Sequence, residues 1–139
     1  MSDRSEIVEA LASFASATDA RVWPTIRSLL TPDAFAYSRS GPDAIVAQMQ
    51  AHLGGVGPTQ HLLGNHRVTV VGDTARSFTY ARVHHVGAGP MAGSFYECPG
   101  EYDDSRVRGP SGWLIAHRVF EIRIGLGDFA VLRPAESAG

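Results

Sequence analysis

The apolar positions at the start of the chain repeat with the period of a helix. Ile7, Leu11 and Phe14 follow one another at intervals of three to four residues. This spacing places the three side chains on one face, because an α-helix turns once in about 3.6 residues. The pattern therefore predicts an amphipathic helix over residues 5 to 18, with its apolar face packed against the rest of the protein.

The next segment predicts two more helices with a short strand between them. Pro24 suits the first turn of a helix over residues 24 to 30, since the N–H that proline lacks would have no partner there. The segment Thr31-Pro32-Asp33 is predicted to end that helix. Residues 34 to 38 then alternate as in a strand, and a third amphipathic helix is predicted over residues 41 to 53.

After this point, apolar and polar residues alternate with the period of two that is typical of strands. Turn-forming residues divide the alternation into four predicted strands, over residues 62–71, 75–86, 93–107 and 112–125. The tail, residues 127–139, is predicted to have little regular structure. Helices followed by a meander of long strands predict an α+β fold, a curved and mainly antiparallel sheet wrapped over the helices with a pocket at its open end. We expect a single domain over residues 1–139 with its core in residues 4–126.

Composition narrows the possible partners. The formal net charge is −2, and the 12 basic residues, all arginines, are dispersed along the chain, so we expect no nucleic-acid partner. Apolar runs fall short of the roughly 18 residues that span a bilayer, so we expect no membrane partner. The single cysteine, Cys98, excludes an internal disulfide and favours a cytoplasmic location. A lone cysteine in a strand is usually a packing residue, which disfavours Cys98 as a nucleophile.

The candidate catalytic residues are expected where the predicted helices meet the predicted sheet. Thr59-Gln60-His61 leads into the first long strand, with Asp19 upstream and His85 downstream. His85 shares its strand face with small residues, whereas His84 shares the other face with large ones: Arg76, Phe78, Tyr80 and Arg82. Small neighbours leave room for a ligand, so His85 is predicted to face the pocket. The large face is predicted to be covered by a second copy in a homo-oligomer, a dimer or trimer.

Several short motifs resemble one known family. They are Asp19 followed by Trp23, Thr31-Pro32-Asp33-Ala34, Thr59-Gln60-His61, Gly72-Asp73-Thr74-Ala75 and Gly112-Trp113. In order and spacing they resemble the SnoaL-like branch of the NTF2-like superfamily over residues 4 to 126. That branch includes scytalone dehydratase, bile acid dehydratases, ketosteroid isomerase and small polyketide cyclases. The resemblance implies a cone-shaped barrel that hosts both enzymes and binding modules.

The site motifs are most similar to those of scytalone dehydratase. The resemblance implies a carboxylate at Asp19 paired with His85, a second histidine at His61 and a pocket tyrosine at Tyr37. Thr18 stands where that site has its other tyrosine. Gly100 and Tyr102 stand where it has a serine and an asparagine, which makes the same substrate unexpected.

These residues suit acid–base chemistry on a small hydrophobic oxygenated substrate such as a polyketide, steroid or terpenoid. Histidine titrates near neutral pH and can both take and give a proton, and a neighbouring carboxylate orients its ring. We predict His85 as the base, oriented by Asp19, with His61 and Tyr37 polarising the substrate oxygen. No cofactor is expected. A side-chain distance between Asp19 and His85 beyond about 4 Å would favour a non-catalytic binding or assembly module instead.

Four further residues are predicted to contact substrate: Thr18, Trp23, Tyr102 and His117. A ketosteroid-isomerase-like site using Tyr102 and Asp103 is a rival within the same fold, but Asp19, His61 and His85 fit the dehydratase pattern better. We expect no metal, because His84 and His85 point to opposite faces of one strand and no His-x-His or His-x-x-x-His pair occurs.

Overall fold

The computed structural model describes residues 1–132 and has three helices in its first part. Helix α1 runs from Asp3 to Ala20, capped at its start by the Ser2 side chain, and its buried face carries the predicted apolar residues. Helix α2 spans Trp23–Ser28 with a proline in its first turn. Helix α3 spans Pro42–Leu53 and begins directly after Gly41. All three predicted helices are present.

In the described part of the chain, eight strands form one sheet. They are β1 (Leu30–Ala36), β2 (Arg39–Ser40), β3 (Val56–Val71), β4 (Thr74–Gly87), β5 (Phe95–Glu97), β6 (Gly100–Gly109), β7 (Gly112–Ile122) and β8 (Leu126–Gly127). The strand order is β2-β1-β7-β6-β4-β5-β8, with β3 paired to β4. Among the strand pairings of residues 1–132, only that of β1 with β7 is parallel, so the sheet is mixed. Short 3-10 helices, η1 (Gly89–Met91) and η2 (Phe129–Leu132), complete the described chain.

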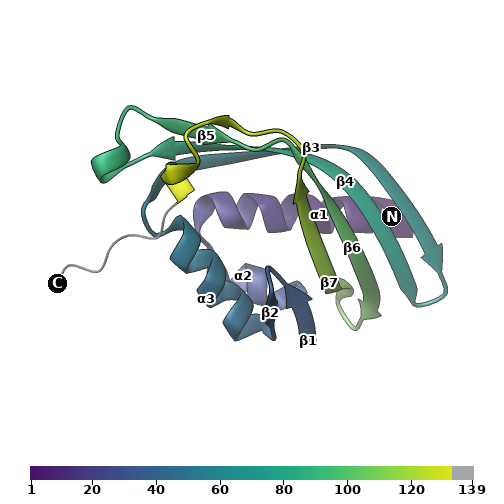
Figure 1. Cartoon of the computed structure of the whole chain (residues 1–139). Coiled ribbons are helices and arrows are strands. Elements are labelled where there is room, and N and C mark those ends of the chain that lie inside the picture. Colours follow the sequence, from purple (N-terminus) through teal and green to yellow (C-terminus); the bar gives the residue numbers. More distant parts are fainter. Residues whose placement is uncertain (133–139) are drawn as a thin grey trace.

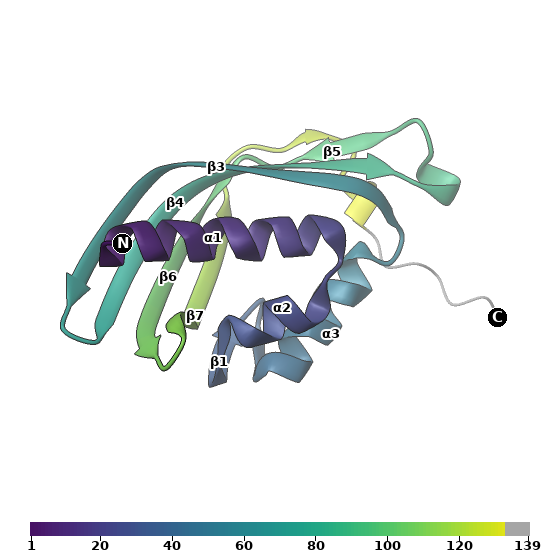
Figure 2. The ribbon, with the colours of Figure 1, turned by 180° about the vertical axis from the view of Figure 1, so that it is seen from behind.

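The sheet curves strongly, and α1 lies along its concave side (Figure 1). Helices α2 and α3 lie together below α1, beside the β1–β2 hairpin, as the reverse view shows (Figure 2). Buried side chains from α1, α2, α3, β1 and β7 form one apolar cluster, and a second lies under β4, β5 and β6. This is the predicted α+β architecture of a curved sheet wrapped over N-terminal helices.

Several element boundaries differ from the sequence prediction. Strand β3 begins at Val56, so Thr59-Gln60-His61 lies within a strand and not in a turn before it. Strand β1 begins at Leu30 and includes Thr31-Pro32-Asp33, the segment predicted only to end a helix. The long strand predicted over 93–107 is two strands separated at Cys98-Pro99, because proline has no N–H to donate to a neighbouring strand.

The tail prediction is wrong within the described residues. Helix η2 packs its Val131 side chain, 2% exposed, into the second cluster, and β8 pairs with β5. Residues 133–139 lie outside the described residues.

A bulge in β7 changes which residues at the end of that strand face inward. Ser105 pairs with His117 and its neighbour Arg106 pairs with Ile115, so Ala116 is an extra residue without a partner. Trp113 and Ile115 are buried before the bulge. After it Arg118 points inward, and His117 is exposed and stacks on Phe35.

Candidate functional site

A cavity of about 410 Å³ opens between the concave face of the sheet, α3 and η2. Among its lining residues are five of the eight predicted site residues: Thr18, Tyr37, His61, His85 and Tyr102. The rest of the lining is largely apolar and comes mainly from α3, β4, β7 and η2. Such a cavity, with a few converging polar groups on apolar walls, is typical of a small-molecule site.

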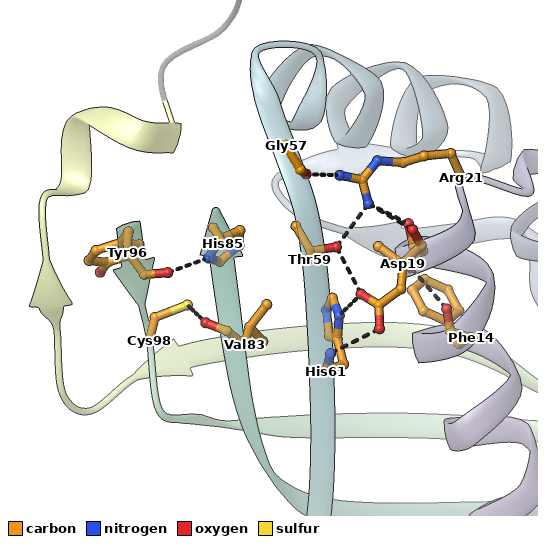
Figure 3. A network of polar contacts seen from close by, with 11 residues as sticks. Phe14, Asp19, Arg21, Gly57, Thr59, His61, Val83, His85, Tyr96 and Cys98 are labelled. Atoms are coloured by element: carbon orange, nitrogen blue, oxygen red, sulfur yellow. Dashed lines mark hydrogen bonds and ion pairs between the residues drawn. The ribbon is translucent and has the colours of Figure 1, made fainter. Parts of the chain in front are cut away.

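Asp19 pairs with His61 across the α1–β3 contact (Figure 3). The His61 ring Nδ1 lies 2.6 Å from Asp19 Oδ1, and the His61 backbone N–H donates to Asp19 Oδ2 at 2.9 Å. Because a carboxylate only accepts, the proton of a neutral His61 ring lies on Nδ1, which leaves Nε2 as the free ring nitrogen. This contact holds the ring in one orientation at the cavity wall.

The environment of Asp19 keeps it ionised. Partial burial opposes its charge, but hydrogen bonds from His61 and Thr59 outweigh burial and hold the pKa of Asp19 below its ordinary value. Asp19 lies in the last turn of α1, where the helix dipole disfavours a negative charge. These hydrogen bonds therefore offset an otherwise unfavourable position.

Arg21 and Thr59 fix the direction of this hydrogen-bond chain. Arg21 has φ 60°, and its left-handed backbone ends α1. Its guanidinium donates to Thr59 Oγ1 at 2.8 Å and to the Gly57 carbonyl at 3.0 Å. Since arginine only donates, the Thr59 hydroxyl is left to donate its own proton to Asp19 Oδ1, at 2.9 Å.

Removing the Thr59 hydroxyl should raise the pKa of Asp19. In Thr59→Val the carboxylate loses one of its donors, and we expect the pKa of Asp19 to rise toward the ordinary value of an aspartate. The Asp19 side-chain carboxyl ¹³C NMR shift, followed through a pH titration, measures the change. Thr59→Ser should leave the value near that of the original protein, as should Thr69→Val on the exposed side of the same strand. An unchanged pKa in Thr59→Val would show that the Thr59 hydroxyl does not support the carboxylate.

The pairing of Asp19 with His85, expected from the resemblance, is wrong. The His85 ring Nδ1 lies 2.9 Å from the Tyr96 backbone oxygen, a carbonyl that only accepts, so Nδ1 carries the proton. The physical reason is register. Thr59 lies opposite His85, whereas His61 lies opposite Val83, and the α1–β3 contact places Asp19 beside His61.

His85 nevertheless faces the cavity, as its strand position predicted. It is 6% exposed on the inner face of β4. The alternation of buried residues on β4 is unbroken from Ser77 to His85, because the bulge in the β3–β4 pairing has its extra residue on β3. Burial disfavours the charged ring and lowers the pKa of His85, with positive charge at neighbouring groups adding to the effect and the Tyr96 carbonyl opposing it. His85 therefore remains neutral near pH 7, and its Nε2 is a hydrogen-bond acceptor.

The tyrosines Tyr37 and Tyr102 reach the same cavity from other elements. Tyr37 is the first residue of the two-residue turn between β1 and β2 and has φ 51°, a conformation rare for an aromatic residue. Tyr102 is on β6 and 4% exposed. Burial raises the pKa of the Tyr102 hydroxyl, and the nearby Tyr37 side chain raises it further. Tyr102 is therefore a phenol that can donate its proton.

Of the other predicted contact residues, Thr18 lines the cavity, whereas Trp23 and His117 do not. Thr18 lines the cavity while its hydroxyl donates to the Phe14 carbonyl at 2.8 Å. Trp23 packs against the apolar cluster of α1, α2 and α3 and does not line the cavity, because α2 turns it toward that cluster. His117 points away from the cavity because of the bulge at Ala116.

Sequence reasoning missed several lining residues. Gln48 and His52 of α3 lie at the cavity rim, and their side chains approach to 3.4 Å. His52 is exposed and also borders the cavity. Phe129 and Leu132 of η2 form a further part of the wall. Their signal was hidden because the tail lacks a clear periodicity.

Cys98 lines the cavity as a thiol. Burial raises its pKa to about 11, so the reactive thiolate is scarce at neutral pH. Within residues 1–132 no group of three or more His, Cys, Asp or Glu side chains is arranged to hold a metal ion. In that same part of the chain, no helix has the length and apolarity needed to cross a bilayer.

Residues 1–119 match the SnoaL-like domain family. The chain belongs to the SnoaL-like family. Protein Rv2910c of Mycobacterium tuberculosis, described as uncharacterized, is 37% identical to this SnoaL-like chain over 125 residues, which cover 86% of the chain and 84% of the relative. The family resemblance stated from the motifs is therefore confirmed.

Solved structures agree with this SnoaL-like fold. A proposed scytalone dehydratase from Novosphingobium aromaticivorans has a TM-score of 0.80 at 15% identity, covering 97% of this chain and 94% of its own. A proposed dehydratase of the NTF2-like family from Streptomyces avermitilis has a TM-score of 0.75 at 18% identity, covering 88% and 97%. At these identities the likeness establishes the fold.

Proposed function

We propose that this protein is a cofactor-independent acid–base enzyme of the dehydratase, isomerase or cyclase type. Its substrate would be a small hydrophobic oxygenated molecule such as a polyketide, steroid or terpenoid. The observation that carries the proposal is the Asp19–His61 pair, which presents a ring nitrogen to the same cavity as the neutral His85. Perturbed titratable groups that converge on an apolar cavity favour proton transfer over simple packing.

Because Asp19 pairs with His61 and not with His85, we propose His61 as the base. In a dehydration, His61 Nε2 takes a proton from the carbon next to a carbonyl, and the charge that develops on the ring is stabilised by Asp19. The carbonyl oxygen becomes an enolate oxygen held by the Tyr37 and Tyr102 hydroxyls. The same proton then passes from His61 to the departing hydroxyl, which leaves as water as the new double bond forms. His85 Nε2 accepts a hydrogen bond from that hydroxyl and orients it.

A panel of hydrophobic cyclic β-hydroxyketones tests this proposal. Loss of water is followed by the absorbance of the enone product, and enolisation is followed by deuterium exchange at the carbon next to the carbonyl by NMR. We expect at least one ketone to exchange or dehydrate faster with the protein than with His61→Asn at the same concentration. Tight binding across the panel with no exchange in any member would exclude the enzyme.

The second candidate is a non-catalytic ligand-binding or assembly module. A specific observation favours it, since Asp19 contacts His61, and the His85 ring contacts the Tyr96 carbonyl and not Asp19. The panel separates the two candidates. A binding module would bind a ketone saturably without accelerating its reaction, so His61→Asn would not change the reaction rate.

We also propose that a second copy covers the outer face of the sheet. Leu62 is 67% exposed and Tyr80 is 52% exposed on neighbouring strands of this face, which is a costly amount of apolar surface to leave in water. Light scattering at micromolar concentration should give a dimer or trimer, and the double variant Leu62→Glu with Tyr80→Glu should give a monomer. Val71→Glu, at the far end of β3, is the control that should leave the oligomer intact. A monomeric original protein would contradict the proposal.

A further inference from the structure

Three charged side chains are buried together behind the cavity wall. Asp104 of β6 accepts two hydrogen bonds from Arg118, at 2.8 and 2.9 Å, and one from Arg106 at 2.9 Å. The side chains of Asp104, Arg106 and Arg118 are 0%, 1% and 2% exposed. Arg106 also donates to the Ser77 hydroxyl at 3.2 Å. Two arginines share one carboxylate, so the cluster carries one excess positive charge.

This excess charge lies directly behind a residue of the cavity. The Arg118 guanidinium carbon is 3.9 Å from the centre of the Tyr102 ring and 4.4 Å from the centre of the Phe14 ring. Tyr102 lines the cavity together with Tyr37, whereas Arg118 does not reach it. The arginine is therefore one aromatic ring away from any ligand at the tyrosines.

An unbalanced buried charge is costly unless something of opposite charge lies near it. The two aromatic faces compensate in part, because the ring faces carry partial negative charge. No Asp or Glu belongs to the lining of the cavity in the described chain, and the carboxylate of Asp19 is already bound to His61 and Thr59. A negatively charged ligand atom beside Tyr102 would supply the missing counter-charge.

We propose that the tyrosine end of the cavity selects an anionic oxygen, an enolate or phenolate, and that Arg118 is the positioning residue that makes it do so through Tyr102. The inference rests on the proposed function and deepens it, since it says which form of the bound molecule the site prefers. Arg118 is disfavoured as a cation by its burial, but Asp104 outweighs this and raises the pKa of Arg118, so the charge is permanent. The Tyr102 hydroxyl stays protonated and donates to the anion.

The probe for this inference is 4-nitrophenol, whose phenol and phenolate forms differ in visible absorbance. Spectral titration of the bound probe against pH, together with equilibrium dialysis, gives the affinity for each form. We expect the phenolate to bind roughly tenfold more tightly than the phenol, as a nearby unit charge in a partly shielded interior would produce. The apparent pKa of the bound probe should accordingly be lower than that of the free probe.

Substitutions identify the source of that preference. Arg118→Met removes the charge at similar length and should abolish the preference, whereas Arg118→Lys should retain part of it. Arg76→Met is the matched control, because it removes the same charge from an exposed pair with Asp103 on the outer face and should leave the preference intact. Tyr102→Phe keeps the buried cluster complete and should weaken the preference, so it serves if Arg118→Met fails to fold.

Each possible result either supports or overturns the inference. Equal affinity for the two forms, or binding of neither, overturns the inference, as does a loss of preference in Arg76→Met equal to that in Arg118→Met. Persistence of the full preference in Tyr102→Phe also overturns it. None of these measurements requires turnover. A phenolate preference without any reaction in the ketone panel would therefore support the inference and contradict only the proposed enzyme.

Discussion

Replacing Asp19 with asparagine should lower the turnover of a ketone found in the panel by at least about a hundredfold while the fold stays intact. Asp19 accepts hydrogen bonds from Thr59, from the His61 backbone and from the His61 ring. Asparagine has a single acceptor oxygen, and its amide group can donate to His61 Nδ1. The ring would then carry its proton on Nε2, and the nitrogen facing the cavity could no longer act as a base.

Related variants should give losses of similar size for separate reasons. His61→Asn removes the proposed base itself, and His85→Asn removes the acceptor that orients the departing hydroxyl. His117→Asn is the matched control, because this histidine lies on the other side of the sheet and should leave kcat/KM unchanged. Circular dichroism and thermal melts check that each variant is folded. Near-normal rates in both Asp19→Asn and His61→Asn would contradict the mechanism.

The sequence predicted the existence of most elements and the inward face of β4. Alternation alone placed His85 with Ala81 and Val83, and these residues are buried on the same side. The prediction held because β4 has no extra residue over that stretch. Alternation from Trp113 and Ile115 would also place His117 on the inner face, but one extra residue, Ala116, reverses the alternation in β7 and leaves no mark in the residue pattern.

Which side chains pair with one another was harder to predict than which side chains lie at the site. The sequence placed Asp19, His61 and His85 at one site. Asp19 and His61 meet at the contact of α1 with β3, and His85 lies on the neighbouring strand β4 (Figure 3). Two features decide which histidine the Asp19 carboxylate contacts. One is the register of β3 against β4, and the other is the end of α1 at Arg21, which has a left-handed backbone. Those features arise from tertiary packing, so motif matching assigned the wrong partner.

The buried arginines illustrate a second limit. Arg106 and Arg118 read in sequence as ordinary charged strand residues, which are rarely fully buried unless paired. Their burial depends on Asp104, two positions from Arg106 on the same face, and on the bulge that turns Arg118 inward. The adjacent Asp103 points outward and pairs with exposed Arg76. Two neighbouring aspartates therefore have opposite environments that their residue type does not distinguish.

The largest effect on stability that we expect follows from the different environments of Asp103 and Asp104. Asp104→Asn would leave Arg106 and Arg118 buried with no counter-charge, and breaking a buried ion pair in this way costs about 3–5 kcal/mol of unfolding free energy. Asp103→Asn makes the same change one residue away at an exposed pair, whose loss should cost only about 0–1 kcal/mol. Urea unfolding followed by far-UV circular dichroism measures both values under the same conditions.

A third variant separates charge imbalance from lost packing. If the cost in Asp104→Asn comes from unpaired positive charge, adding Arg118→Met should recover part of the stability, because one of the two stranded cations is removed. If the cost comes from packing alone, the double variant should be less stable than either single variant. Equal stability of Asp104→Asn and Asp103→Asn would mean that the buried cluster contributes no more than a surface pair. In that case the inferred excess charge behind Tyr102 would have no physical support.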